Sequence, residues 1–172
     1  MAVIDIHGHL NAPAALYAYK SGLLSSRGQH GKGRLNITEE QMAGMVKNHL
    51  TNTLDKVGTD VQFLYARPFQ LMHSEKPDRI VHWFNEANND LVAQSVKLAP
   101  TRYAGIATLP QAGTAPVTSY FEEMDRCIND LGMVGIMINP DPTEGLDHVP
   151  GMGDEWWYPL YEKMVKMSVP AV

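Results

Sequence analysis

Apolar segments of strand length alternate with amphipathic segments of helix length along the chain. Short apolar runs predict strands over residues 2–6, 61–65, 103–107, 133–138 and 168–172. Apolar residues three and four positions apart predict helices that begin at Pro13, Thr38, Pro77, Thr114 or Pro116, and Asp154. Thr38 and Gln41 have the spacing of a capping box. This alternation, with nearly all-apolar strands, is typical of an α/β fold in which helices cover a parallel sheet.

Two architectures fit this order of elements, a doubly wound open sheet and a (β/α)8 barrel of the TIM type. No Gly-x-Gly-x-x-Gly pattern follows the first strand, which disfavours a dinucleotide-binding open sheet. A whole barrel needs about 250 residues, whereas this chain of 172 supplies four βα units plus strand 5. No linker or repeat divides residues 1–172, so we expect a single domain that is the N-terminal portion of a longer barrel. A complete open sheet is the alternative.

Two histidines, His7 and His9, follow the first predicted strand and are separated only by Gly8. Side chains at positions i and i+2 of a strand point to the same face, so the two imidazoles should project side by side. Two converging imidazoles are half of a divalent-metal site, and a catalytic site needs further ligands from later strands. The pair predicts bound zinc, with manganese or iron as alternatives. The competing interpretation is a pair of histidines without a ligand.

Other polar residues follow the remaining strands, where ligands of parallel α/β folds bind. Arg67 comes directly after the second strand and could bind a substrate carboxylate through two parallel hydrogen bonds, or lie on the surface. His73 could be a proton donor or a substrate contact, but a solvated loop histidine is the favoured interpretation. Asn139 could contact substrate or only shape the turn before Asp141. Asn11 and Gln111 should open on the same rim.

Composition excludes several classes of partner. The 14 Lys and Arg against 19 Asp and Glu give a net charge of −5 without a basic patch, which disfavours nucleic acid and membrane surfaces. Neither a membrane-spanning stretch nor a signal peptide is visible, and a single cysteine, Cys127, fits the cytoplasm. We expect Cys127 to be a buried sulfur rather than a catalytic thiol. The remaining residues expected to be structural or exposed are His30, His49, His82, His148, Trp156 and Trp157.

The segment Val3–His9 resembles the first-strand metal motif of the amidohydrolase superfamily. The segments 109–111, 138–142 and 157–164 are similar to the amidohydrolase-related group that contains aminocarboxymuconate semialdehyde decarboxylase, γ-resorcylate decarboxylase and 4-oxalomesaconate hydratase, the last being the most similar. The resemblance implies a (β/α)8 barrel with His7 and His9 as the first two metal ligands. It also implies a further histidine ligand after strand 5 and an acidic ligand and general base on the last strand.

The resemblance implies a metal-dependent lyase, a hydratase acting on a small unsaturated oxo-carboxylate from aromatic-compound catabolism. A decarboxylase of hydroxybenzoate or muconate-type acids and a hydrolase of amides or lactones are alternatives within the superfamily. A non-catalytic α/β protein with weak or no metal binding is the alternative of another class. The resemblance also implies a homo-oligomer. Because two ligands and no general base are identified, we expect a chain that ends at Val172 to be inactive alone.

Overall fold

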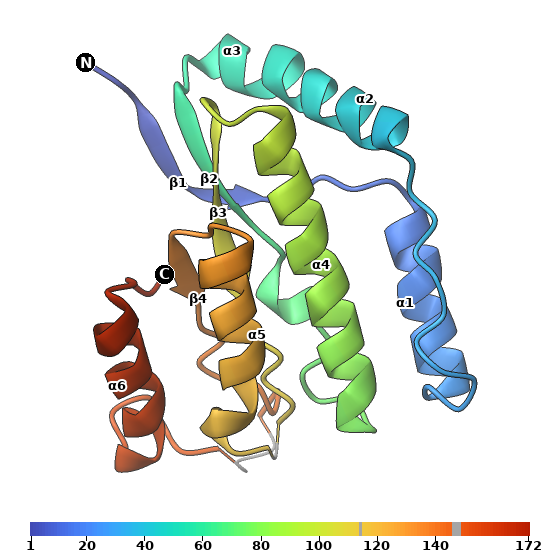
Figure 1. Cartoon of the computed structure of the whole chain (residues 1–172), viewed down its shortest axis with the longest axis vertical. Coiled ribbons are helices and arrows are strands. Elements are labelled where there is room, and N and C mark those ends of the chain that lie inside the picture. The colour runs from blue at the N-terminus through green and yellow to red at the C-terminus, as the bar shows by residue number, and fades with distance from the viewer. Residues whose placement is uncertain (114, 146–148) are drawn as a thin grey trace.

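Four parallel strands form one sheet in the order β1-β2-β3-β4, so that strands consecutive in the chain are neighbours. The computed structural model describes residues 1–113, 115–145 and 149–172. The strands are β1 (Ile4–His9), β2 (Val61–Tyr65), β3 (Tyr103–Thr108) and β4 (Gly135–Met137). A helical crossover joins each strand to the next (Figure 1). This topology is that of the first half of a (β/α)8 barrel and confirms the predicted fold class.

The helices of the crossovers are divided into more and shorter segments than the sequence pattern predicts. The helical segments are α1 (Ala15–Ser26), α2 (Glu39–His49), η1 (Leu50–Leu54), α3 (Asp55–Val57), η2 (Pro68–Gln70), α4 (Asp78–Leu98), η3 (Val117–Tyr120), α5 (Phe121–Asp125), η4 (Arg126–Asp130), η5 (Glu155–Trp157) and α6 (Tyr158–Met167). The capping box is confirmed at the start of α2. The Gln41 amide donates to Thr38 Oγ1 over 3.2 Å, and the Thr38 amide donates to Gln41 Oε1 over 2.9 Å. Gly58, with φ of 74°, ends α3 as expected.

Four predicted strands have different bounds in the structure. Strand β3 ends one residue later, at Thr108, and β4 is shorter than the predicted 133–138. Strand β1 continues to His9, so both histidines of the motif lie within the strand and not beyond its end. The segment 168–172 is reduced to a single parallel bridge from Ala171 to Ile136 of β4. The backbone amide of Val172 donates to the Ile136 carbonyl over 2.8 Å, which sets this segment beside β4. Thr114, one of the two residues proposed to begin the fourth helix, lies outside the described residues.

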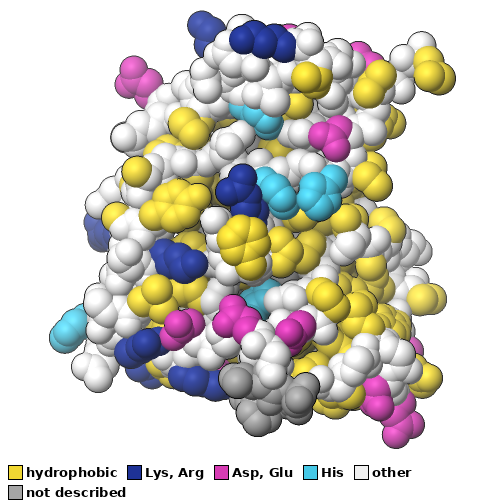
Figure 2. Space-filling model, turned by 180° about the vertical axis from the view of Figure 1, so that it is seen from behind, with side chains coloured by type: hydrophobic (Ala, Val, Ile, Leu, Met, Phe, Trp, Pro, Cys, Tyr) yellow, Lys and Arg dark blue, Asp and Glu magenta, His cyan; other side chains and the backbone are white. Residues whose placement is uncertain are grey.

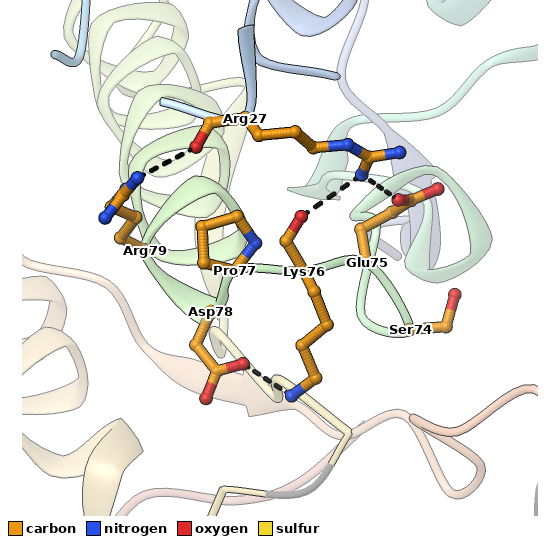
Figure 3. A pocket seen from close by; sticks show the side chains of 7 residues that line it. All are labelled: Arg27, Ser74, Glu75, Lys76, Pro77, Asp78 and Arg79. Carbon is orange, nitrogen blue, oxygen red and sulfur yellow. Dashed lines mark hydrogen bonds and ion pairs between the residues drawn. The ribbon is translucent and has the colours of Figure 1, made fainter. Parts of the chain in front are cut away.

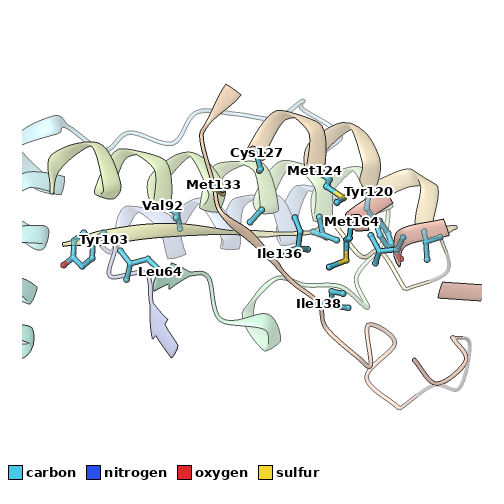
Figure 4. Close-up of a cluster of buried hydrophobic side chains, with 14 of the residues drawn as sticks. Leu64, Val92, Tyr103, Tyr120, Met124, Cys127, Met133, Ile136, Ile138 and Met164 are labelled. Atoms are coloured by element: carbon cyan, nitrogen blue, oxygen red, sulfur yellow. The ribbon is translucent and has the colours of Figure 1, made fainter. Parts of the chain in front are cut away.

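The core lies between the sheet and the helices that cover it. One cluster joins β2, β3 and β4 to α4, α5 and α6, and includes Leu64, Val92, Met124 and Ile136 (Figure 4). A second cluster joins α1 to the sheet and to α4. Cys127 and Trp157 are fully buried, which confirms that both are packed core side chains. Burial raises the pKa of the Cys127 thiol, which makes it a poor nucleophile.

A buried asparagine of α4 holds the carboxyl end of β3. Asn89 Nδ2 donates to the Thr108 carbonyl over 2.9 Å, and Asn89 Oδ1 accepts from the amide and the hydroxyl of Thr108 over 3.0 and 2.9 Å. Asn85 donates to the same carbonyl over 2.8 Å. These bonds fix the point at which the chain leaves β3 toward Gln111.

Among the described residues, no helix is both long and apolar enough to cross a membrane.

Candidate metal centre and active-site rim

His7 and His9 sit at the end of β1, held in register by the neighbouring strand β2, where His9 pairs with Tyr65. The register shifts between Asp5 and Gly8. A Cβ on Gly8 would lie 2.4 Å from the Gln62 side chain and 2.6 Å from the Phe63 carbonyl oxygen. Any side chain at position 8 would therefore push β1 away from β2. Glycine is required between the two histidines because the backbones approach so closely.

The two imidazoles face each other across a short gap. Their ring centroids are 5.0 Å apart, and the ring planes make an angle of 74°. Nitrogen–zinc distances of about 2.0–2.1 Å and tetrahedral angles place two imidazoles on one zinc ion at centroid separations of about 5 Å. The predicted side-by-side arrangement is therefore present, and its spacing fits one ion.

A tyrosine completes this aromatic cluster. The Tyr65 hydroxyl, at the end of β2, lies 2.9 Å from His7 Nδ1. The Tyr65 ring is 5.7 Å from the His7 ring and 5.3 Å from the His9 ring, nearly perpendicular to both. Sequence reasoning did not single out Tyr65. Only the position of this residue at the end of a strand next to the histidine strand could have indicated it.

The electrostatics around His9 favour its neutral form. Burial lowers the pKa of His9, and electrostatic repulsion from His7 and Arg67 lowers it further, while a hydrogen bond to the Tyr65 backbone acts in the opposite direction. His9 Nδ1 is buried and has no hydrogen-bond partner among the described residues. A neutral imidazole with an unpartnered nitrogen suits a metal ligand, because only the unprotonated nitrogen can coordinate. The described residues contain no group of three or more His, Cys, Asp or Glu side chains placed to hold a metal, so they offer the histidine pair without a third such side chain.

Asp5 lies two residues before His7 and is engaged elsewhere. Gln62 Nε2 donates to Asp5 Oδ2 over 2.6 Å, and the His7 amide donates to Asp5 Oδ1 over 3.0 Å. The bond from Gln62, followed by the one from the His7 amide, lowers the pKa of the Asp5 carboxyl. Asp5 thus ties β1 to β2 and helps to fix the backbone at His7.

Arg67 is exposed beyond the end of β2, at the start of the short turn η2. Its charge contributes to the lowered pKa of His9, so the guanidinium acts electrostatically on the histidine pair. Figure 2 shows histidine side chains beside a basic side chain and exposed apolar side chains on one face of the molecule. A cation at such a rim can bind an anionic substrate group.

A second polar group joins the loops that follow β2, β3 and β4. Gln111 Nε2 donates to the Asn139 carbonyl over 2.9 Å, and the Asn139 amide donates to Gln111 Oε1 over 2.8 Å. The Asn139 side chain lies 2.8 Å from His73 Nδ1. Asn139 Oδ1 accepts from the Asp141 amide over 3.0 Å, so Asn139 Nδ2 faces the imidazole and donates to it. The predicted rim residues His73, Gln111 and Asn139 are thus brought together.

His73 is only 1% exposed, so the favoured interpretation of a solvated loop histidine is wrong. The loop after β2 folds inward here, and the imidazole lies beneath Asn139. Burial lowers the pKa of His73 to about 4, while the Leu109 carbonyl acts in the opposite direction. His73 is therefore neutral at pH 7, with Nδ1 as the acceptor and Nε2 carrying the proton.

An open cavity of about 950 Å³ lies between the end of α1 and the start of α4, and none of these site residues lines it (Figure 3). Four of its charged side chains form two ion pairs, Arg27 with Glu75 and Lys76 with Asp78. Arg27 bonds Glu75 and the Lys76 carbonyl, and Lys76 Nζ lies 2.6 Å from Asp78 Oδ1. Arg79, the fifth charged side chain of the wall, donates to the Arg27 carbonyl over 3.1 Å.

The other histidines have structural or exposed positions, as expected, except that His148 lies outside the described residues. His30 is exposed, and His82 is half-buried on α4. His49 is stacked on Tyr103, with its Nδ1 3.0 Å from the hydroxyl.

Comparisons with known proteins agree with this geometry. A family model described as "Amidohydrolase" matches residues 4–172. The 2-keto-4-carboxy-3-hexenedioate hydratase of a Sphingobium species is 32% identical over 176 residues, which cover 100% of this chain and 51% of that protein. The crystal structure of 4-oxalomesaconate hydratase from Rhodopseudomonas palustris superposes with a TM-score of 0.88 at 26% identity, over 98% of this chain and 51% of that one.

A dihydroxybenzoic acid decarboxylase from a Polaromonas species, solved with bound manganese, superposes with a TM-score of 0.65 at 20% identity, over 99% of this chain and 48% of that one. At this identity the likeness shows the fold alone. The chain spans about half the length of the relatives it matches. The match to the family model extends over β1 to β4 and includes the histidine pair at the end of β1. The chain belongs to the amidohydrolase family.

Proposed function

We propose that this chain is part of a metal-dependent lyase, a hydro-lyase that adds water to a small unsaturated oxo-carboxylate from aromatic-compound catabolism. The facing imidazoles of His7 and His9, 5.0 Å apart at the carboxyl edge of the sheet, carry the proposal. The 32% identity to a hydratase over the whole chain supports the hydro-lyase class.

His7 and His9 would hold a divalent cation, most favourably zinc, with manganese or iron as alternatives. When bound, such a cation supplies the Lewis acidity that activates water and polarises a carboxylate or carbonyl oxygen. The unpartnered Nδ1 of the half-buried His9 and its lowered pKa support this role. A catalytic zinc has three protein ligands or more, so further ligands are needed beside these two.

Arg67 would bind a carboxylate of the substrate, because its guanidinium is exposed at the rim and electrostatically coupled to His9. The Asn139 side chain is half-buried at the neighbouring rim and would bind a second polar group of the substrate. His73 would act through Asn139, since its Nδ1 accepts from Asn139 Nδ2 and thereby fixes the amide. Its burial and low pKa disfavour a role as a proton donor at pH 7.

A carboxy-lyase is the second candidate, favoured by the 35% identity over 83 residues to the gamma-resorcylate decarboxylase of a Rhizobium species. Hydrolysis of amides or lactones uses the same kind of metal site, of which two histidines are half. A homo-oligomer and the cytoplasmic location stay predictions.

Product analysis tests the proposal. The natural full-length chain, loaded with zinc or manganese, would be incubated with unsaturated oxo-diacids, hydroxybenzoates and lactones. Hydration of an oxo-diacid without release of carbon dioxide is the expected result. Release of carbon dioxide would select the decarboxylase, and a protein that retains no metal would refute the proposal.

Arg67→Gln tests the carboxylate contact. Charged hydrogen bonds contribute about 1.5–3 kcal/mol, so KM for the carboxylate substrate should rise roughly 10- to 100-fold. Arg34→Gln, at another exposed position, is the matched control and should leave KM unchanged. An unchanged KM in Arg67→Gln would contradict the assignment of Arg67.

A further inference from the structure

Among the described residues, the imidazole of the candidate ligand His7 has one side-chain hydrogen bond, with the Tyr65 hydroxyl. Tyr65 is 2% exposed, and its ring is held between the strand backbone and the two imidazole rings. Its place is set by the parallel pairing of β2 with β1, in which Tyr65 lies opposite His9. The strand pairing therefore positions the Tyr65 hydroxyl oxygen 2.9 Å from His7 Nδ1.

The hydrogen bond between Tyr65 and His7 bears on which nitrogen of His7 can coordinate a metal. A neutral imidazole carries one proton, and only its other nitrogen can coordinate a metal. The protonated nitrogen of a metal ligand normally donates to an oxygen, which fixes the tautomer and the ring orientation. A phenol oxygen can accept such a bond.

We infer that Tyr65 is a positioning residue for the metal centre, whose hydroxyl oxygen accepts from His7 Nδ1 and so leaves Nε2 of His7 for the cation. The inference rests on the proposed metal site of His7 and His9. Without the Tyr65 hydroxyl, the proton of His7 is free to reside on Nε2, and the His7 ring is free to turn. Tyr65 thus acts on metal binding through His7 and does not touch the cation.

A second tyrosine provides an internal comparison. Tyr103, on β3, is 3% exposed, and its hydroxyl lies 3.0 Å from Nδ1 of a histidine, His49. That pair is stacked, with an interplanar angle of 18°, and includes neither member of the facing histidine pair. Tyr103→Phe removes the same kind of buried hydroxyl from the same kind of contact, and it is therefore a matched control for Tyr65→Phe.

The test is a zinc affinity measured by chelator competition on the natural full-length chain. Loss of a hydrogen-bond partner of a metal ligand typically weakens affinity 10- to 100-fold. Tyr65→Phe should weaken zinc binding by this factor, whereas Tyr103→Phe should leave it within about twofold of wild type. Thermal unfolding of both variants checks that each is folded.

A direct readout of the tautomer is the ¹⁵N spectrum of the His7 ring in the metal-free wild-type protein. We expect the proton on Nδ1, and in Tyr65→Phe a shift toward the form protonated on Nε2. This spectrum decides the matter even if Tyr65→Phe fails to fold, because a wild-type His7 protonated on Nε2 would overturn the inference.

His7→Ala separates the two proposals. If His7→Ala abolishes zinc binding and Tyr65→Phe binds zinc like wild type, the role of Tyr65 is wrong and the metal site stands. If His7→Ala binds zinc like wild type, the proposed metal site itself is wrong.

Discussion

Protonation of one side chain, the buried imidazole of His73, should be a distinct part of the loss of stability between pH 7 and pH 4. Its pKa is lowered to about 4 in the folded protein because the ring is removed from water. In the unfolded chain the pKa returns to about 6.5. The unfolded state therefore takes up a proton first as the pH falls, and stability decreases from about pH 6.5 until the folded state is protonated near pH 4.

The magnitude follows from the separation of the two pKa values. At about 1.4 kcal/mol per pKa unit, the difference between the folded and unfolded values corresponds to roughly 3 kcal/mol. The geometry explains why the folded state resists protonation. A proton on Nδ1 would face the Asn139 Nδ2 group, which is itself a donor at 2.8 Å.

The assay is urea unfolding at a series of pH values for the wild type and for His73→Gln. Carboxylates and the other histidines titrate in both proteins, so the difference between their free energies of unfolding isolates His73. The free energy of unfolding of the wild type, relative to the variant, should decrease by roughly 3 kcal/mol between pH 7 and pH 4. A difference that stays constant over this range would refute the reasoning, because His73 would then titrate alike in both states.

Two further substitutions test how the site is supported. Asn89→Ala leaves two buried donors of Thr108 unpaired and should lower the free energy of unfolding, measured in urea, by about 2–4 kcal/mol. The control Asn88→Ala loses one hydrogen bond to a carbonyl of its own helix and should lower it by about 1 kcal/mol. Equal costs would contradict the role of Asn89 at the end of β3. Gly8→Ala should lower both the melting temperature and the zinc affinity, because its Cβ meets the backbone of β2, whereas Gly22→Ala, with open space around it, should lower neither.

The fold was largely predictable because its signals are local. Apolar runs, a capping box at Thr38 and a glycine stop at Gly58 are read within a few residues. The end of β1 was misjudged because its length depends on pairing with β2, where His9 lies opposite Tyr65. Such a register pairs residues more than fifty positions apart, and the sequence of neither segment alone indicates it.

The site divides in the same way. The side-by-side arrangement of His7 and His9 follows from strand geometry and could be predicted. The burial of His73 could not, because it depends on Asn139, 66 residues later in the chain. Tyr65 was overlooked for a related reason. A tyrosine at a strand end is ordinary until the neighbouring strand shows which ring its hydroxyl reaches.

The most direct test of the metal centre is anomalous X-ray diffraction from crystals of the natural full-length chain loaded with zinc. For the proposed metal centre we expect one peak between the two imidazoles, within about 2.0–2.1 Å of a nitrogen of His7 and of a nitrogen of His9. A zinc peak elsewhere, with the space between these two rings empty, would contradict the proposal.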